Sequence, residues 1–203
     1  LNQLAEGWRY ALARQHLRAA VIFAGIGALA GRSVLETLPI LADGVFGKGP
    51  SGLGYMTAAA GAGAAAASIF KAVSRPQIPG EFQPQILAMP VIIPLLVAAF
   101  AMIGDFATAV AAVTLVGATV TLMSISLQST VQMEIEDQYR GRVMGLWTTI
   151  SIGSGAAGAV LMGFLVDLVG VAPAQLMIGL VLAAASVLVL LRFRRGLSQA
   201  DAR

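Results

Sequence analysis

Six long apolar stretches constrain the fold of this chain more than any other feature of its sequence. They cover approximately residues 17–42, 51–70, 84–104, 106–132, 143–166 and 174–191. Each is close to the roughly 20 residues that a helix needs to cross the hydrocarbon core of a bilayer. Because backbone polar groups in lipid must be hydrogen-bonded internally, the stretches predict transmembrane helices. We therefore expect residues 1–203 to form a single all-α membrane bundle of six helices.

The composition favours a membrane protein and gives an enzyme little support. Hydrophobic residues make up 58% of the chain and charged residues 11%, against about 25% charged residues in a typical soluble domain. The chain has no cysteine, which removes thiolate metal ligands and cysteine nucleophiles. We expect no catalytic residue, no metal and no cofactor. The lack of a basic patch interleaved with aromatic residues argues against a nucleic-acid partner.

The basic residues predict how the chain is oriented in the bilayer. With both termini in the cytoplasm, eleven of the 13 Lys and Arg residues fall in cytoplasmic segments, as the positive-inside rule requires. They are Arg9, Arg14, Arg18, Lys71, Arg75, Arg140, Arg142, Arg192, Arg194, Arg195 and Arg203. Lys48 falls in an outer connection, and Arg32 falls within the first span. We expect a multi-pass protein of the inner (plasma) membrane.

Small residues recur at helical spacing in several of the predicted spans. Gly27 and Gly31 form a GxxxG pair, and Gly155, Ala159 and Gly163 repeat at the same four-residue spacing. Such faces allow helix backbones to approach closely in lipid. The pattern fits a mobile interface between helices and static close packing equally well.

Arg32 and Glu36 are the sharpest polar feature inside a span. They are four residues apart and therefore share one face of a helix. A charge at the bilayer centre costs about 2.5–3.5 kcal/mol on insertion scales, so a functional role is a reasonable hypothesis. The pair could line a cavity, bind substrate or carry protons, with Glu36 as the proton carrier because arginine does not deprotonate. The alternative is a structural ion pair, with Arg32 extending toward the interface.

The fourth predicted span ends in a polar segment. Gln128 and Gln132 are four residues apart and share a helical face. They are candidates for a polar substrate route near the inner mouth of the bundle. Hydrogen bonding between helices is the alternative.

The connection at residues 134–142 carries both signs of charge. Arg140 and Arg142 could pair with Glu134, Glu136 or Asp137 in one conformation only, which would make a cytoplasmic gate latch. Exposed ion pairs contribute only about 0–1 kcal/mol each, so a surface cluster that only sets topology is the alternative. We expect the nearby tryptophan at position 147 to anchor the chain at the membrane interface.

Three groups of motifs extend across nearly the whole chain. Residues 6–10 are EGWRY, residues 38–63 include LPILA, GLGYM and GAG, and residues 139–147 are YRGRVMGLW, followed by a glycine-rich stretch. In these motifs the chain resembles the C-terminal six-helix half of a major facilitator superfamily permease. More narrowly, it resembles the bacterial efflux branch that contains the enterobactin exporters.

The resemblance implies secondary active efflux of a small molecule by alternating access, coupled to protons. It also implies a bundle built from inverted three-helix repeats. A complete permease of this kind has about twelve spans, so the expected partners are the lipid bilayer, a small-molecule substrate and a missing N-terminal six-helix half. On this interpretation the chain is a half or a fragment. The alternative is a structural or regulatory membrane subunit without transport activity, or the degenerate remnant of a permease.

Overall fold

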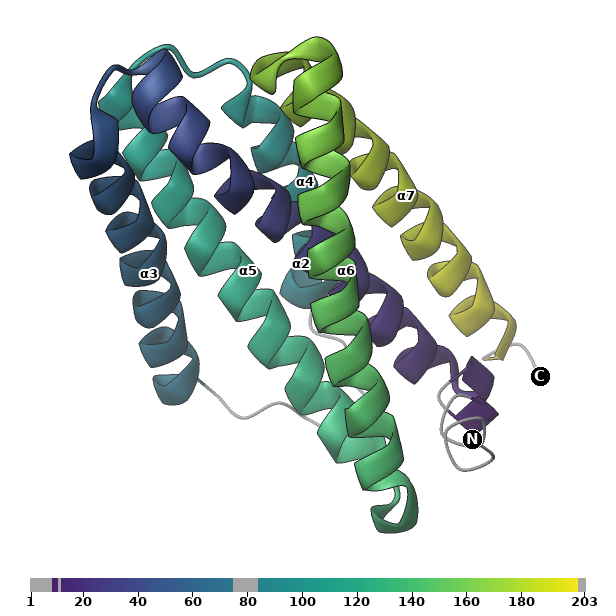
Figure 1. Cartoon of the computed structure of the whole chain (residues 1–203). Helices are drawn as coiled ribbons and strands as arrows, with labels where there is room; N and C mark the ends of the chain where they lie inside the picture. Colours follow the sequence, from purple (N-terminus) through teal and green to yellow (C-terminus); the bar gives the residue numbers. More distant parts are fainter. Residues whose placement is uncertain (1–8, 11, 75–83, 201–203) are drawn as a thin grey trace.

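The computed structural model describes residues 9, 10, 12–74 and 84–200, apart from the side chains of residues 84–86 and 194–200. Within these residues, six long helices form an elongated bundle (Figure 1). They are α2 (Gln15–Ile40), α3 (Gly49–Val73), α4 (Pro84–Phe100), α5 (Phe106–Glu134), α6 (Arg140–Val169) and α7 (Val171–Ala200). The all-α fold expected from the sequence is confirmed. Arg75 and Arg203 of the predicted cytoplasmic segments lie outside the described residues.

Successive helices run in opposite directions through the bundle. The connections α2–α3, α4–α5 and α6–α7 lie at one end, and the α5–α6 connection lies at the other (Figure 1). The start of α2 and the end of α7 lie at the same end as the α5–α6 connection. Two short elements extend the long helices: a π-helical turn, η1 (Leu41–Val45), continues α2, and a 3-10 turn, η2 (Asp137–Tyr139), precedes α6.

Five helices in the described part of the chain are long and apolar enough to span a membrane, namely α2 with η1, α3, α5, α6 and α7. The sixth, α4, has a shorter apolar segment, Leu87–Phe100. The predicted third span extended to residue 104, and that boundary is wrong. Residues 101–103 form turns in which each amide donates to the carbonyl three residues back. After these turns Asp105 caps the start of α5, its carboxylate accepting from the Thr108 amide at 2.9 Å.

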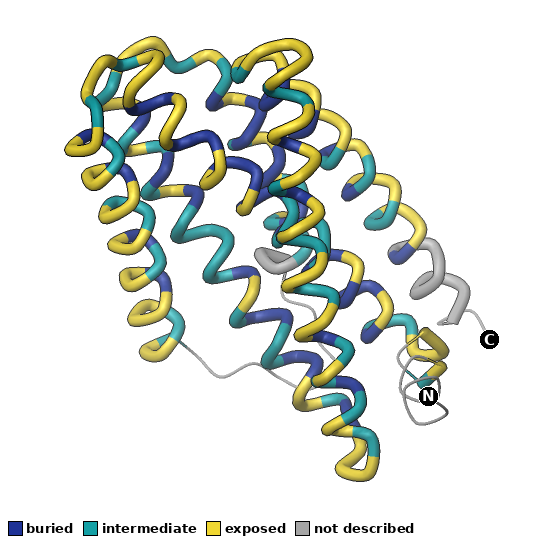
Figure 2. The backbone as a smooth tube through the Cα atoms, in the orientation of Figure 1, coloured by how far each residue is buried: buried dark blue, intermediate teal, exposed yellow. Residues whose placement is uncertain are grey.

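The central helix of the bundle is α2. Of its most apolar segment 56% is buried, against 11% for α6, and the buried residues in Figure 2 gather where α2 crosses the bundle. Leu17, Phe23 and Val34 are fully buried on it. The Gln175 side chain of α7, 1% exposed, donates to the Thr37 hydroxyl of α2 at 2.9 Å. This bond satisfies two buried polar groups and ties α7 to the centre.

Glycines mark the closest contact in the bundle, between α3 and α5. A Cβ on Gly63 would clash with the Thr114 carbonyl oxygen, and a Cβ on Gly117 would clash with the Ala60 carbonyl oxygen. Both obstacles are backbone atoms, which cannot turn aside as the end of a side chain can. Glycine is therefore required at both positions for the two helices to approach this closely.

The pairs α2·α6 and α4·α7 are built in the same way. A Cβ on Gly158 of α6 would lie 2.6 Å from the Leu29 carbonyl oxygen of α2, and one on Gly179 of α7 would lie 2.5 Å from the Ala98 amide nitrogen of α4. A Cβ on Gly163, one of the spaced small residues in α6, would meet no described atom of another helix within 4 Å. The small-residue pattern is therefore only partly explained by close packing.

The packing follows the pattern of two inverted three-helix repeats. The most extensive contacts are α3·α5, α2·α6 and α4·α7. The helices α2, α3 and α4 can be matched in order with α5, α6 and α7. Under this exchange the pair α3·α5 becomes α2·α6, the pair α2·α6 becomes α3·α5, and the pair α4·α7 is unchanged. Equivalent members, such as α2 and α5, are three positions apart in a chain of alternating helices, so the two repeats run in opposite directions.

Candidate functional site

An open-sided cleft of about 800 Å³ lies where the pairs α2·α6 and α3·α5 face one another. The two pairs that exchange under the repeat pattern thus supply its opposing walls. The lining residues are Ala28, Gly31, Arg32, Val34 and Leu35 of α2, Ala60 and Ala64 of α3, Val113, Val116, Gly117, Val120 and Thr121 of α5, and Ser151, Ile152, Gly155, Ala156, Ala159 and Val160 of α6.

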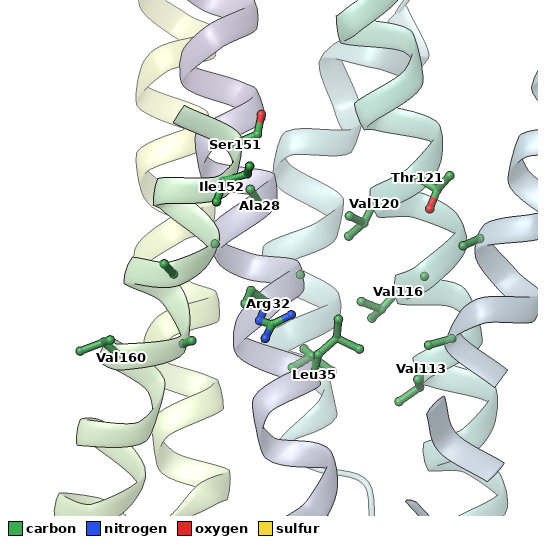
Figure 3. Close-up of a pocket in the computed structure, with 18 residues that line it drawn as sticks. Ala28, Arg32, Leu35, Val113, Val116, Val120, Thr121, Ser151, Ile152 and Val160 are labelled. Carbon is green, nitrogen blue, oxygen red and sulfur yellow. The ribbon is translucent and has the colours of Figure 1, made fainter. Parts of the chain in front are cut away.

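The walls of the cleft are mostly apolar, and the α2 and α5 side chains face the same space. Figure 3 shows Arg32 and Leu35 on one side and Val116 and Val120 on the other. A Cβ on Gly31 of α2 would lie 3.1 Å from a methyl group of Val120 on α5, so glycine at this position leaves room for the Val120 side chain. Thr121 and Ser151 add hydroxyl groups. Such a surface suits a ligand with an apolar body and few polar groups.

Arg32 and Glu36 form the ion pair that their spacing predicted. Arg32 Nη2 lies 2.6 Å from Glu36 Oε1, and the side chains are 54% and 38% exposed. Arg32 lines the cleft, and Glu36 lies one helical turn along α2, outside the lining. Pairing lowers the cost of holding both charges in an apolar setting. The cleft therefore presents a guanidinium that is anchored on its own helix.

Gln128 and Gln132 are not brought to this cleft. Gln128 is half-buried and Gln132 is exposed, both toward the end of α5 that leads into the α5–α6 connection. The last α5 residue in the cleft lining is Thr121, about two turns earlier. The predicted pathway residues thus lie in two separate places on the bundle.

A second polar cluster, here called the terminal clasp, joins Tyr10 and Arg14 to Glu136 and Tyr139. The Arg14 guanidinium pairs with the Glu136 carboxylate at 2.5 Å and lies over the Tyr10 ring, 4.4 Å from its centroid. The Tyr10 and Tyr139 rings stack with centroids 4.3 Å apart. The Glu136 amide donates to the Tyr10 hydroxyl at 3.3 Å. The clasp therefore ties the segment before α2 to the α5–α6 connection.

The predicted gate residues lie around this clasp: Arg140 pairs with one of its predicted partners, Asp137, whereas Glu136 pairs with Arg14. Arg140 pairs with Asp137, three residues earlier, at 3.4 Å, and both side chains are well exposed. The Glu134 backbone carbonyl accepts a hydrogen bond from Arg14 at 3.2 Å. Arg142 is half-buried in the first turn of α6. The Arg140–Asp137 pair thus lies on the surface of the loop, while the longer-range contacts of this region run through Arg14.

The Glu136 carboxylate of the clasp has a further hydrogen-bond partner beside Arg14. Gln138 donates to its second oxygen at 3.1 Å. Hydrogen bonds from Gln138 and then from Arg14 hold the pKa of Glu136 below its ordinary value. The ionised carboxylate is thus the form that the folded chain favours.

Sequence reasoning missed Arg14 and Tyr10 as partners of this loop. Arg14 counted only toward topology, because its partner lies 122 residues away. The expectation for Trp147 is wrong: its side chain is 5% exposed and belongs to the core. The reason is that α6 begins at Arg140, which places Trp147 two turns inside the helix, facing its neighbours.

Comparison with known families decides the class of the protein. Residues 1–202 match a family described as the transmembrane secretion effector family of the major facilitator superfamily. The chain belongs to this family. No match was found among curated proteins or among solved structures. The match and the five membrane-length helices make the chain a multi-pass membrane permease of an efflux type.

Proposed function

We propose that this permease chain is one six-helix half of a secondary active exporter, with the cleft as its share of the substrate pathway. The observation that carries the proposal is the position of the cleft, between the two helix pairs that the inverted repeats make equivalent. Alternating access in such transporters moves repeats or bundles around a fixed central site. A cleft lined by both repeats is where that site is expected.

The exposed face around the cleft supports a proposal for where the expected N-terminal half binds. The most apolar segments of α6 and α3 are only 11% and 17% buried, although both helices line the cleft. A second six-helix bundle over this face would enclose the cleft and turn it into a central cavity. We therefore propose that half as the principal partner, with lipid around α4 and α7.

We further propose Glu36 as the proton-coupling group and the inner membrane as the location, with both termini cytoplasmic. The described basic residues at the terminal end of the bundle support this orientation under the positive-inside rule. A membrane-impermeant thiol reagent applied to intact cells should label Lys48→Cys and leave Arg140→Cys unlabelled. The reverse labelling would invert the topology.

Cysteine accessibility tests the pathway directly, because the chain has no cysteine of its own. In the full-length natural protein, with any cysteine outside this chain replaced by serine, Ser151→Cys and Val120→Cys should react with a hydrophilic thiol reagent. Two control positions should resist it: Met162→Cys, fully buried on α6, and Leu188→Cys, exposed on the apolar α7 surface. If the cleft cysteines are as unreactive as the controls, the cleft is no aqueous pathway, and a non-transporting subunit becomes the better account.

A further inference from the structure

The Arg32 guanidinium is only partly used by its ion pair. Arginine carries five N–H donors, and the described contacts engage it through Nη2 with one oxygen of Glu36. The side chain is 54% exposed and lines the cleft from α2 (Figure 3). The remaining N–H groups leave the guanidinium open to an anionic ligand that competes with Glu36 for it.

Among the residues that line the cleft, Arg32 is the single ionisable one. Its carboxylate partner, Glu36, lies outside the lining, so the charged group on the cleft wall is the guanidinium. The remaining surface is formed chiefly by aliphatic side chains, with Leu35 beside Arg32 and Val116 and Val120 opposite. The cleft thus combines an apolar wall with one cation at its edge.

We propose that the cargo is an amphipathic organic anion whose acidic group binds Arg32 in competition with Glu36, while its apolar body lies on the cleft walls. The inference rests on the cleft being the substrate site, as proposed above. Planar oxyanions such as carboxylates match the two parallel N–H groups of the guanidinium, and sulfonates offer two oxygens in a similar way. Charge-assisted hydrogen bonds of this type are about twice as strong as hydrogen bonds between neutral groups. A cationic cargo would instead meet a like charge.

Competition at one guanidinium predicts opposite effects for the two members of the pair. Arg32→Gln removes the anion site and should weaken binding of an anion roughly 10- to 100-fold. Glu36→Gln removes the competitor and should tighten binding about 3- to 10-fold. A purely structural ion pair predicts the same sign for both changes, because either one breaks it.

Three probes with one aromatic body and different charge test the proposal: pyrenesulfonate, pyrenesulfonamide and (pyrenylmethyl)trimethylammonium. Their binding is measured on the full-length natural protein in phosphatidylcholine nanodiscs, with empty nanodiscs as the control for partitioning. Tightest binding of the sulfonate to the wild type, with opposite shifts in Arg32→Gln and Glu36→Gln, supports the proposal. Melting temperatures of both variants establish that each is folded.

The other outcomes separate the two levels of inference. Binding of all three probes with affinities that do not depend on Arg32 overturns the anion preference and leaves the cleft as the substrate site. Binding of none overturns the cleft as well. Loss of sulfonate binding when phosphatidylglycerol is added identifies an anionic lipid as the occupant of the Arg32 site, which also overturns the proposal.

Discussion

Two Arg–Glu pairs in this permease have nearly the same geometry and quite different settings. Arg32 and Glu36 lie 2.6 Å apart and are four residues apart on α2, beside an apolar cleft. Arg14 and Glu136 lie 2.5 Å apart and are separated by 122 residues, at the polar end of the bundle. In an apolar setting a charge is costly and is retained for a function, whereas in water a pair contributes little but can join distant segments. On this comparison we propose a role in transport for the first pair and a role in the scaffold for the second.

The largest expected effect comes from the contact between α2, which carries Arg32 and Glu36, and α6. In Gly158→Val, the added side chain must push α6 away from the Leu29 backbone of α2, so transport and thermal stability should both be lost. Transport is measured as efflux from proteoliposomes, and thermal stability is measured as the melting temperature in detergent. Gly163→Val in the same helix is the control, because its Cβ would meet no described atom of another helix within 4 Å. Equal damage by both variants would contradict the assigned packing.

The next effect separates transport from stability at the cleft pair itself. Glu36→Gln keeps the shape of the side chain and removes its charge, so the proton flux that accompanies export should fall by about tenfold or more, as expected for loss of a proton-transfer group. Internal pH recorded with an entrapped dye during substrate efflux gives the stoichiometry. Glu136→Gln is the matched control and should keep wild-type coupling. Unchanged proton stoichiometry in Glu36→Gln would remove this residue from the mechanism.

A smaller effect is expected at the terminal clasp. Arg14→Gln and Glu136→Gln should each lower the melting temperature by about 1–3 °C, and the double variant should lose no more than either single one. The loss should shrink at high salt, because exposed charges are screened. Arg140→Gln, which breaks the local pair with Asp137, should change the melting temperature less. Additive losses in the double variant would show that Arg14 and Glu136 do not interact.

The smallest effect is a pH dependence of the same clasp. Because the pKa of Glu136 is lowered in the folded chain, its contribution is fully present above the ordinary value of 4.5 and is lost as pH falls below it. The melting temperature of the wild type should therefore fall more steeply than that of Glu136→Gln between about pH 5 and pH 3. Parallel pH profiles for the two proteins would mean that Glu136 is not stabilised in its ionised form.

Most of the fold could be predicted from hydrophobic length, because bilayer thickness fixes how long an apolar helix must be. The six helices begin and end within a few residues of the predicted spans, except at two ends. The third span was predicted four residues too long, and α7 continues to Ala200, beyond its predicted end at residue 191. Hydropathy predicts which residues can lie in the hydrocarbon core. It does not predict where a turn begins or how far a helix continues into water.

For the candidate site, contacts within one helix could be predicted from the sequence, and contacts between distant segments could not. Arg32 and Glu36 could be paired from sequence because helical periodicity alone brings them together. The cleft depends on Gly31, Gly117 and Gly158 meeting partners on other helices, and sequence spacing does not identify those partners. For the same reason Arg14 could not be matched to Glu136, and Trp147 could not be placed in the core.

The most direct test of the central claim is to block the cleft during transport. Ser151→Cys in the full-length natural protein, reconstituted in proteoliposomes, is labelled with a bulky maleimide, and proton-driven efflux of pyrenesulfonate is measured before and after labelling. Leu188→Cys, exposed on the apolar surface of α7 away from the cleft lining, is labelled in parallel after detergent solubilisation. We predict that labelling at Ser151 abolishes efflux and that labelling at Leu188 leaves it unchanged. Full efflux through a protein with a labelled cleft would contradict the account.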